Sequence, residues 1–124
     1  MATIKLYTDL EQSRKLSEIL PLESVDMRIG NYVGKSGKVD GTNIHYYTKG
    51  ETFGAPQIIE AWSLAALLDV IPGGQVNRMA YSDKYEASSW YNSDFEPAYY
   101  VEDCDNAIDA CYEMVLQLYK LNLL

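Results

Sequence analysis

The run of residues that most suggests chemistry is Gly30-Asn31-Tyr32-Val33-Gly34-Lys35-Ser36. It is close to a phosphate-binding P-loop, in which backbone N–H groups at a helix N-terminus hold the phosphates. That motif needs four residues between its glycines, and here there are three. The next residues, Gly37 to Gly41, favour a turn and not a helix. We therefore predict that this run forms the tip of a β-hairpin.

His45 is the only histidine, so a Ser-His-Asp or Cys-His catalytic group would have to use it. It lies in a predicted strand with no evident nucleophile, and we interpret it as an ordinary half-exposed strand residue. Cys104 and Cys111 lie in a predicted helix, about 10 Å apart along its axis, which is too far for a disulfide. We expect free, mostly buried thiols and a reducing compartment. These residues cannot make a four-ligand zinc site without carboxylates, and we predict no metal and no cofactor.

Acidic residues also suggest sites that their spacing does not support. The run Asp103-Cys104-Asp105 is similar to the start of a calcium loop, but it lacks the glycine at the sixth position and has Met114 at the twelfth. We expect these acids to cap a helix instead. A carboxylate pair for acid–base catalysis could come from Asp83, Glu86, Asp94 and Glu96. Because the chain has 18 acidic residues, proximity between some of them carries little information.

Aromatic residues are the anomaly of the composition. The chain has eleven tyrosines and two tryptophans, and seven aromatic residues fall between Tyr81 and Tyr100. Tyrosine and tryptophan anchor protein interfaces, yet tyrosine is also a good strand residue, and both interpretations stay open. The predicted interaction surface consists of Tyr81, Tyr85, Trp90, Tyr91, Tyr99 and Tyr100.

Composition limits the class of protein. The chain has 124 residues, 48% of them hydrophobic, which is enough to form a core without staples. Its net charge of −8, with no basic run, predicts no nucleic-acid partner. The acidity suits a basic partner, mimicry of nucleic acid, or solubility alone. The longest apolar run, Leu64 to Leu68, is too short to span a membrane. No signal-like segment starts the chain, so we predict no membrane association and a cytoplasmic location.

Periodicity predicts the elements that would position these residues. A helix over 9–20 starts with a capping box at Thr8 and Glu11 and stops at Pro21. Strands over 27–33 and 43–48 form the hairpin, and residues 49–56 are a loop. A helix follows Ser63 and ends at Pro72, with Trp62 as a core or staple residue. The apolar face of that helix consists of Leu64, Leu67, Leu68 and Ile71.

The second half of the chain adds strands over 76–81, 85–91 and 97–101 and a helix over 106–121. The predicted apolar face of that helix consists of Ile108, Cys111, Tyr112, Val115, Leu118 and Tyr119. Short turns between strands predict antiparallel pairing. We therefore predict an α+β fold, with a mainly antiparallel sheet, about three helices packed against it, and the order α-β-β-α-β-β-β-α. The prediction is a single α+β domain over residues 1–124.

Four segments of the chain form a recognisable set: Thr8 to Leu16, Leu22 to Met27, Ala61 to Leu68 and Ala107 to Met114. In this order they resemble a family of small proteins from Bacteroides-type gut bacteria and their phages or prophages. The family usually has proline before its Ala-Trp-Ser-Leu unit; here Glu60 stands there and Pro56 comes four residues earlier. The resemblance implies a bacterial or phage cytoplasmic setting, and no activity, substrate or site.

Two functions follow as hypotheses. The first is a non-enzymatic binding or interaction protein of phage or mobile-element origin, with a protein partner or a second copy of itself in a homodimer on the aromatic sheet. The alternative is a small-molecule-binding protein or small hydrolase with a site between the hairpin of residues 27–48 and the sheet. A flat exposed row of tyrosines favours the first, and a concave cluster with convergent carboxylates favours the second.

Overall fold

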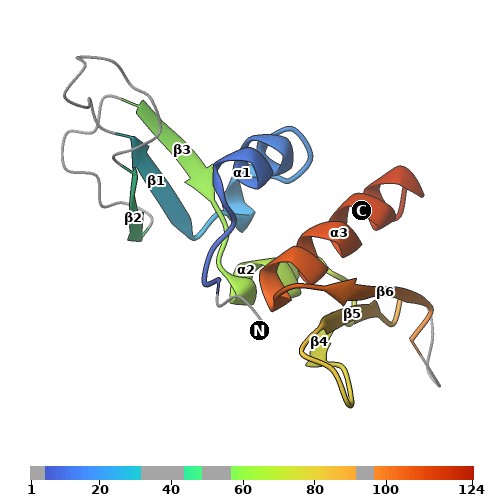
Figure 1. Cartoon of the computed structure of the whole chain (residues 1–124). Helices are drawn as coiled ribbons and strands as arrows, with labels where there is room; N and C mark the ends of the chain where they lie inside the picture. Colours follow the sequence, from blue (N-terminus) through green and yellow to red (C-terminus); the bar gives the residue numbers. More distant parts are fainter. Residues whose placement is uncertain (1–4, 32–43, 49–56, 92–96) are drawn as a thin grey trace. The chain divides into compact units, whose positions relative to one another are not determined.

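Figure 1 shows the computed structural model of the chain, which describes residues 5–31, 44–48, 57–91 and 97–124. Within these ranges the chain forms three α-helices, one short 3₁₀ helix and six strands. In chain order they are α1 (Leu10–Ser17), η1 (Leu22–Ser24), β1 (Met27–Asn31), β2 (Ile44–Thr48), β3 (Gln57–Ala61), α2 (Leu64–Val70), β4 (Gln75–Arg78), β5 (Tyr85–Ser89), β6 (Tyr99–Cys104) and α3 (Ala107–Lys120).

The α+β class with antiparallel strands is confirmed, and every predicted helix and strand is present in the predicted order. The structure adds strand β3, which the sequence analysis did not assign. The described strands form two sheets, with orders β2-β1-β3 and β4-β5-β6, and not one sheet. The loop-flanked position of β3 explains the omission, since only five residues separate Pro56 from Trp62.

The chain divides into two compact units, and each is described by itself. Residues 9–62 form one, here named the hairpin unit, and residues 1–8 with 63–124 form the other, named the helix–sheet unit. The expectation of one domain over residues 1–124 stays a prediction.

In the hairpin unit, α1 begins one residue later than the sequence predicts. Asp9, not Thr8, is the N-cap: its Oδ1 accepts from the backbone N–H of Gln12 at 2.8 Å. The Gln12 Oε1 accepts from the backbone N–H of Asp9 at 3.2 Å and completes the capping box. The helix also ends earlier, at Ser17, because Glu18 and Ile19 donate to carbonyls three residues back and tighten the last turn ahead of Pro21.

The sheet of the hairpin unit is centred on β1. Ile29 pairs with Tyr46 of β2 on one side and with Ile59 of β3 on the other, and its side chain is fully buried. Trp62 is a core residue, as predicted, with no exposed surface. Its indole N–H donates to the Ser24 hydroxyl at 2.9 Å, which satisfies the polar atom of a buried ring.

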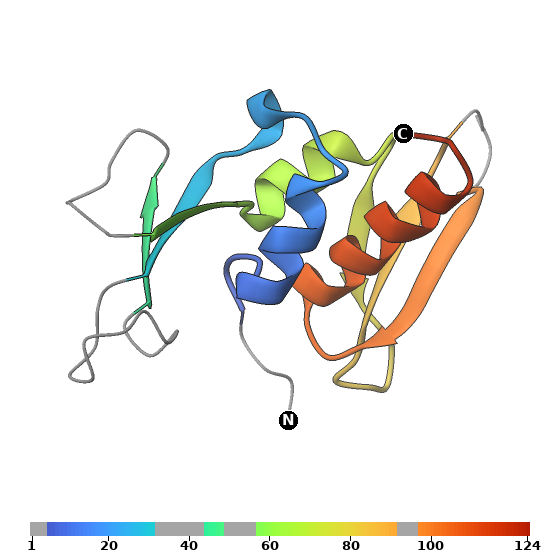
Figure 2. The same ribbon diagram turned by 90° about the horizontal axis from the view of Figure 1, so that it is seen from above.

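In the helix–sheet unit, α3 lies across one face of the sheet β4-β5-β6 (Figure 2) and contacts both β5 and β6. Its buried face matches the predicted one at four positions, but Tyr119 is exposed and Tyr112 only half-buried. α2 is capped by Ser63 as predicted, and of the predicted apolar face Leu67 and Ile71 are buried, whereas Leu64 and Leu68 are only half-buried. The buried residues of α3 are Ile108, Ala110, Cys111, Met114, Val115 and Leu118.

Cys104 is not in a helix, which corrects the sequence prediction. It ends β6, and α3 starts only after Asn106, whose side chain accepts from the backbone N–H of Asp109 at 2.8 Å. The acidic run extends the strand because its pairing register shifts between Tyr85 and Ala87, and Asp103 adopts a positive φ of 60°. Both cysteines are free thiols, as predicted, with Cys111 buried and Cys104 partly so. No helix in the described part of the chain is long and apolar enough to cross a membrane.

Candidate binding groove beside strand β6

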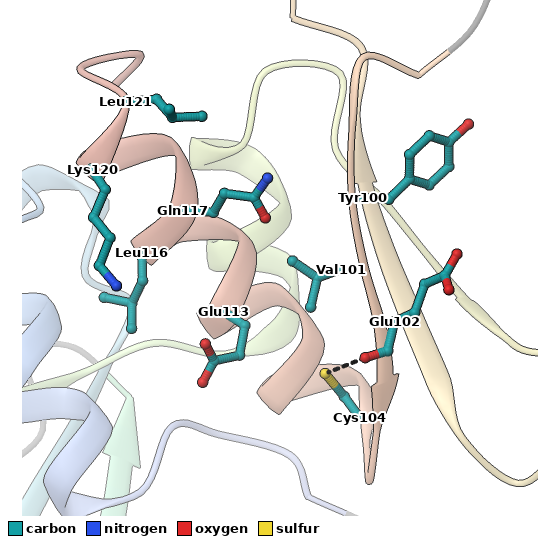
Figure 3. A pocket seen from close by; sticks show the side chains of 9 residues that line it. All are labelled: Tyr100, Val101, Glu102, Cys104, Glu113, Leu116, Gln117, Lys120 and Leu121. Carbon is teal, nitrogen blue, oxygen red and sulfur yellow. Dashed lines mark hydrogen bonds between the residues drawn. The ribbon is translucent and has the colours of Figure 1, made fainter.

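An open groove of about 630 Å³ runs between β6 and α3 in the helix–sheet unit (Figure 3). We name it the edge groove. One wall is the last strand of the sheet, and the other is a helix face whose residues recur at intervals of three and four. The lining residues are Tyr100, Val101, Glu102, Cys104, Glu113, Leu116, Gln117, Lys120 and Leu121.

Strand β6 is an edge strand in the described part of the chain. The sheet order places it beside β5 alone, with Tyr99, Tyr100 and Val101 opposite Ser89, Ser88 and Ala87. In an antiparallel pair, alternate residues point their backbone N–H and C=O groups away from the partner strand. An edge strand therefore presents a row of hydrogen-bonding groups that another extended segment can use.

Side chains of β6 divide between the two faces of the sheet. Val101 points toward α3 and into the groove, whereas Tyr100 and Glu102 point to the opposite side of the strand (Figure 3). Val101 and Leu116 are half-buried, and Leu121 at the end of the helix keeps 49% of its surface exposed. The groove thus combines an apolar wall with backbone polar groups at its rim.

The charge of the groove is mostly negative. Glu102 and Glu113 are exposed, and neither carboxylate has an ion-pair partner among the described residues. Burial raises the pKa of the Cys104 thiol, and the negative charge of Glu113 is the next largest cause of the increase. Lys120 supplies the positive charge of the lining.

The thiols are poor nucleophiles. Burial raises the pKa of Cys111 to about 12, and the pKa of Cys104 is raised as well. A reactive cysteine needs the opposite shift, because the thiolate is the attacking species. The structure therefore gives no support to a cysteine-based reaction in this unit.

The predicted interaction surface is only partly assembled at the groove. Of its six residues, Tyr100 alone lines the groove, where it is half-exposed. Tyr81 is fully exposed in the turn between β4 and β5. The other four, Tyr85, Trp90, Tyr91 and Tyr99, are half-buried, so the six do not form a uniformly exposed row. Their role in binding stays a prediction.

Sequence analysis missed the helical wall of the groove. Glu113, Leu116, Gln117 and Lys120 follow each other at helical spacing. Leu116 lies beside the predicted apolar face of α3 and not within it, which is a signal for a second contact surface.

Other suggested sites receive no support from the described residues. The glycine-rich tip falls mostly in residues 32–43, and the side chain of His45 also lies outside the described part. Asp94 and Glu96 lie outside it too, so a catalytic carboxylate pair among the four acids named from sequence is not tested. Within the described residues, no three His, Cys, Asp or Glu side chains lie close enough together to hold a metal ion. The alternative site at the hairpin of residues 27–48 stays a prediction, because residues 32–43 lie outside the described part of the chain.

No family model, curated protein or solved structure matches this chain.

Proposed function

We propose that this chain is a non-enzymatic binding protein that holds a protein partner in the edge groove. The observation that carries the proposal is the position of the groove: it lies at the free edge of β6 and is partly apolar. Free sheet edges and partly exposed apolar grooves are both surfaces that proteins use for recognition. Working in the bacterial cytoplasm is in keeping with two free thiols. A phage or mobile-element origin, implied by the family resemblance, completes the proposal.

The test compares two leucines. The tagged protein is used to capture partners from a lysate of a Bacteroides-type gut bacterium, with identification by mass spectrometry. Leu121→Arg places a cation at the groove, and Leu6→Arg makes the same change at a leucine of the same unit outside the groove lining, with exposed fractions of 49% and 64%. We expect Leu121→Arg alone to lose a partner that the parent protein captures. Equal capture by all three proteins would contradict the proposal.

A further inference from the structure

We infer that the occupant of the edge groove is an extended peptide segment carrying lysine or arginine at alternate positions, paired with β6 as a fourth strand of the sheet. This inference rests on the proposed function and names the partner's chemistry. Its basis is the juxtaposition of a strand that is at the sheet edge in the described part of the chain, a helix wall on which Leu116 and Leu121 lie among polar residues, and unpaired carboxylates.

Among the described residues, the edge of β6 is protected only at its end, where Glu102 and Asp103 are charged and the pairing register shifts. Natural sheets blunt edge strands with charged side chains, above all lysine, with proline, with bulges or with a covering element. From Tyr99 to Cys104, β6 contains neither lysine nor proline. The register shift opposite Tyr85 and Ala87 falls at Glu102 and Asp103, so the regularly paired portion of β6 runs from Tyr99 to Val101 and Glu102 lies at its end. This portion is long enough for a short main-chain ladder.

The two faces of an added strand would meet different surroundings. An incoming strand lies about 4.8 Å from its neighbour and sends alternate side chains to opposite faces. On the α3 face these side chains would meet Val101 and Leu116, which are apolar and half-buried. On the other face they would meet Tyr100 and Glu102, which point away from α3 (Figure 3).

Charge selects a basic segment. A lysine or arginine on the second face lies opposite Glu102 in the sheet, where opposite charges on directly facing residues stabilise pairing. The same cation is near the ring of Tyr100, which offers its face to a positive charge. Glu113 adds negative charge on the helix side of the groove. Recognition by strand addition thus gains affinity from the backbone and specificity from alternate side chains.

A second copy of the chain is the less favoured occupant. Two copies of β6 would bring Glu102 and Asp103 of one chain near the same residues of the other. Each chain also carries a net charge of −8, so approach is opposed within the Debye length of about 8 Å at physiological salt. A basic segment is attracted by the same field that repels a copy.

Binding of synthetic octapeptides to the full chain tests the inference, with fluorescence anisotropy for affinity and amide NMR shifts for location. The probes are an alternating Lys–Val peptide, a Glu–Val peptide, and two Lys–Val peptides N-methylated at one or the other set of alternate residues. We expect the Lys–Val peptide to shift amides of β6 and of the groove side of α3, and Glu–Val to bind at least about tenfold more weakly. One N-methylated peptide should lose binding and the other keep it, because a strand pairs through one edge only.

Charge reversal in the protein separates local pairing from net charge. Glu102→Lys should weaken Lys–Val binding by about tenfold, whereas Glu23→Lys, an exposed glutamate in the hairpin unit, changes net charge equally and should have little effect. Equal losses in both variants, equal binding of Glu–Val, or indifference to both methylation patterns would each overturn the inference. If the chain without peptide is a dimer and its β6 amides shift on dilution, the occupant of the edge groove is a second copy of the chain and not a peptide. If capture still depends on Leu121 while no extended peptide binds, the proposed function stands and this inference falls.

Discussion

The two units differ in the kind of side chain that their helices bury. The helix–sheet unit relies on one 14-residue helix that buries six side chains, none of them charged. The 8-residue α1 of the hairpin unit buries Gln12 and Ser13 beside Leu16, and Trp62 of the same unit needs Ser24 as an acceptor. Arg28 and Glu60 add an ion pair at 3.4 Å between facing positions of β1 and β3. The helix of the hairpin unit thus buries polar side chains, whereas in the helix–sheet unit the buried polar residues, Thr8, Ser88, Ser89 and Asn106, lie outside the helices.

This difference bears on where a binding surface can form. A helix that already buries a continuous apolar face can expose further residues, such as Leu116 and Leu121, without weakening its own packing. In the hairpin unit the described cavity is smaller, about 160 Å³, and lies against Trp62 and Glu60. Among the described residues, this difference favours the helix–sheet unit as the place of the proposed binding.

Removal of one core leucine from each unit has the largest expected effect, and it tests whether the two units lose stability independently. Leu118→Ala in α3 and Leu16→Ala in α1 each remove a fully buried side chain, and each should lower the free energy of unfolding by about 2–5 kcal/mol. Hydrogen exchange with mass spectrometry then shows which amides lose protection. We expect losses confined to the mutated unit. Loss of protection in both units from either substitution would support one cooperative domain.

Two neighbouring leucines in α2 test which of its side chains belong to the core of the helix–sheet unit. Sequence periodicity assigns Leu67 and Leu68 to the same buried face, but Leu67 is fully buried and Leu68 only half-buried. We expect Leu67→Ala to destabilise by about 2–5 kcal/mol and Leu68→Ala by about 1 kcal/mol. Chemical denaturation of both variants measures the difference. Equal shifts of the midpoint would place both side chains in the core.

Elements that depend on residues close together in the chain could be predicted from the sequence. Elements that depend on residues far apart in the chain could not. Helical periodicity and local caps located α2 and α3, because the residues that determine them are close neighbours in the chain. The start of α1 was wrong by one residue because Thr8-Asp9 offers two possible caps, each with a suitable partner three residues later, and local pattern alone does not choose. The added strand β3 depends on pairing with β1, 30 residues away at Ile29 and Ile59.

The candidate site was harder to predict than the fold. Aromatic clustering pointed to Tyr100, but no local pattern places Glu113 and Leu116 beside β6. That juxtaposition comes from α3 folding back over the strand that precedes it. The error at Cys104 has a similar origin, because the strand continues through the positive-φ residue Asp103, which the sequence pattern does not reveal.

Alkaline pH should weaken the helix–sheet unit through Cys111. Its pKa rises from 9.0 to about 12 because burial penalises the thiolate. Between these values the folded chain holds a proton that the unfolded chain has released, so this contribution is complete below pH 9 and is lost as pH rises toward 12. The loss should reach roughly 1 kcal/mol by about pH 10. Denaturation midpoints from pH 8 to 10 should fall less steeply in Cys111→Ala, and parallel slopes would exclude the thiol as the cause.

A single hydrogen bond between Ser24 and Trp62 links two elements of the hairpin unit. The Ser24 hydroxyl donates to the Pro21 carbonyl at 2.6 Å and accepts the Trp62 indole N–H at 2.9 Å. Ser24→Ala removes this acceptor from a fully buried ring, and a buried donor left without its partner costs about 1–2 kcal/mol. Ser24→Thr keeps the hydroxyl and should restore most of the loss.

Fluorescence of Trp62 reports this change directly once Trp90 is replaced. Trp90→Phe is a suitable background because the Trp90 indole N–H has no hydrogen-bond partner among the described residues, so the substitution removes no such bond. In that background, denaturant unfolding of Ser24→Ala should show a lower midpoint and an altered Trp62 emission in the folded state. If Ser24→Ala and the parent unfold at the same midpoint, the hydrogen bond between Ser24 and Trp62 does not stabilise the hairpin unit.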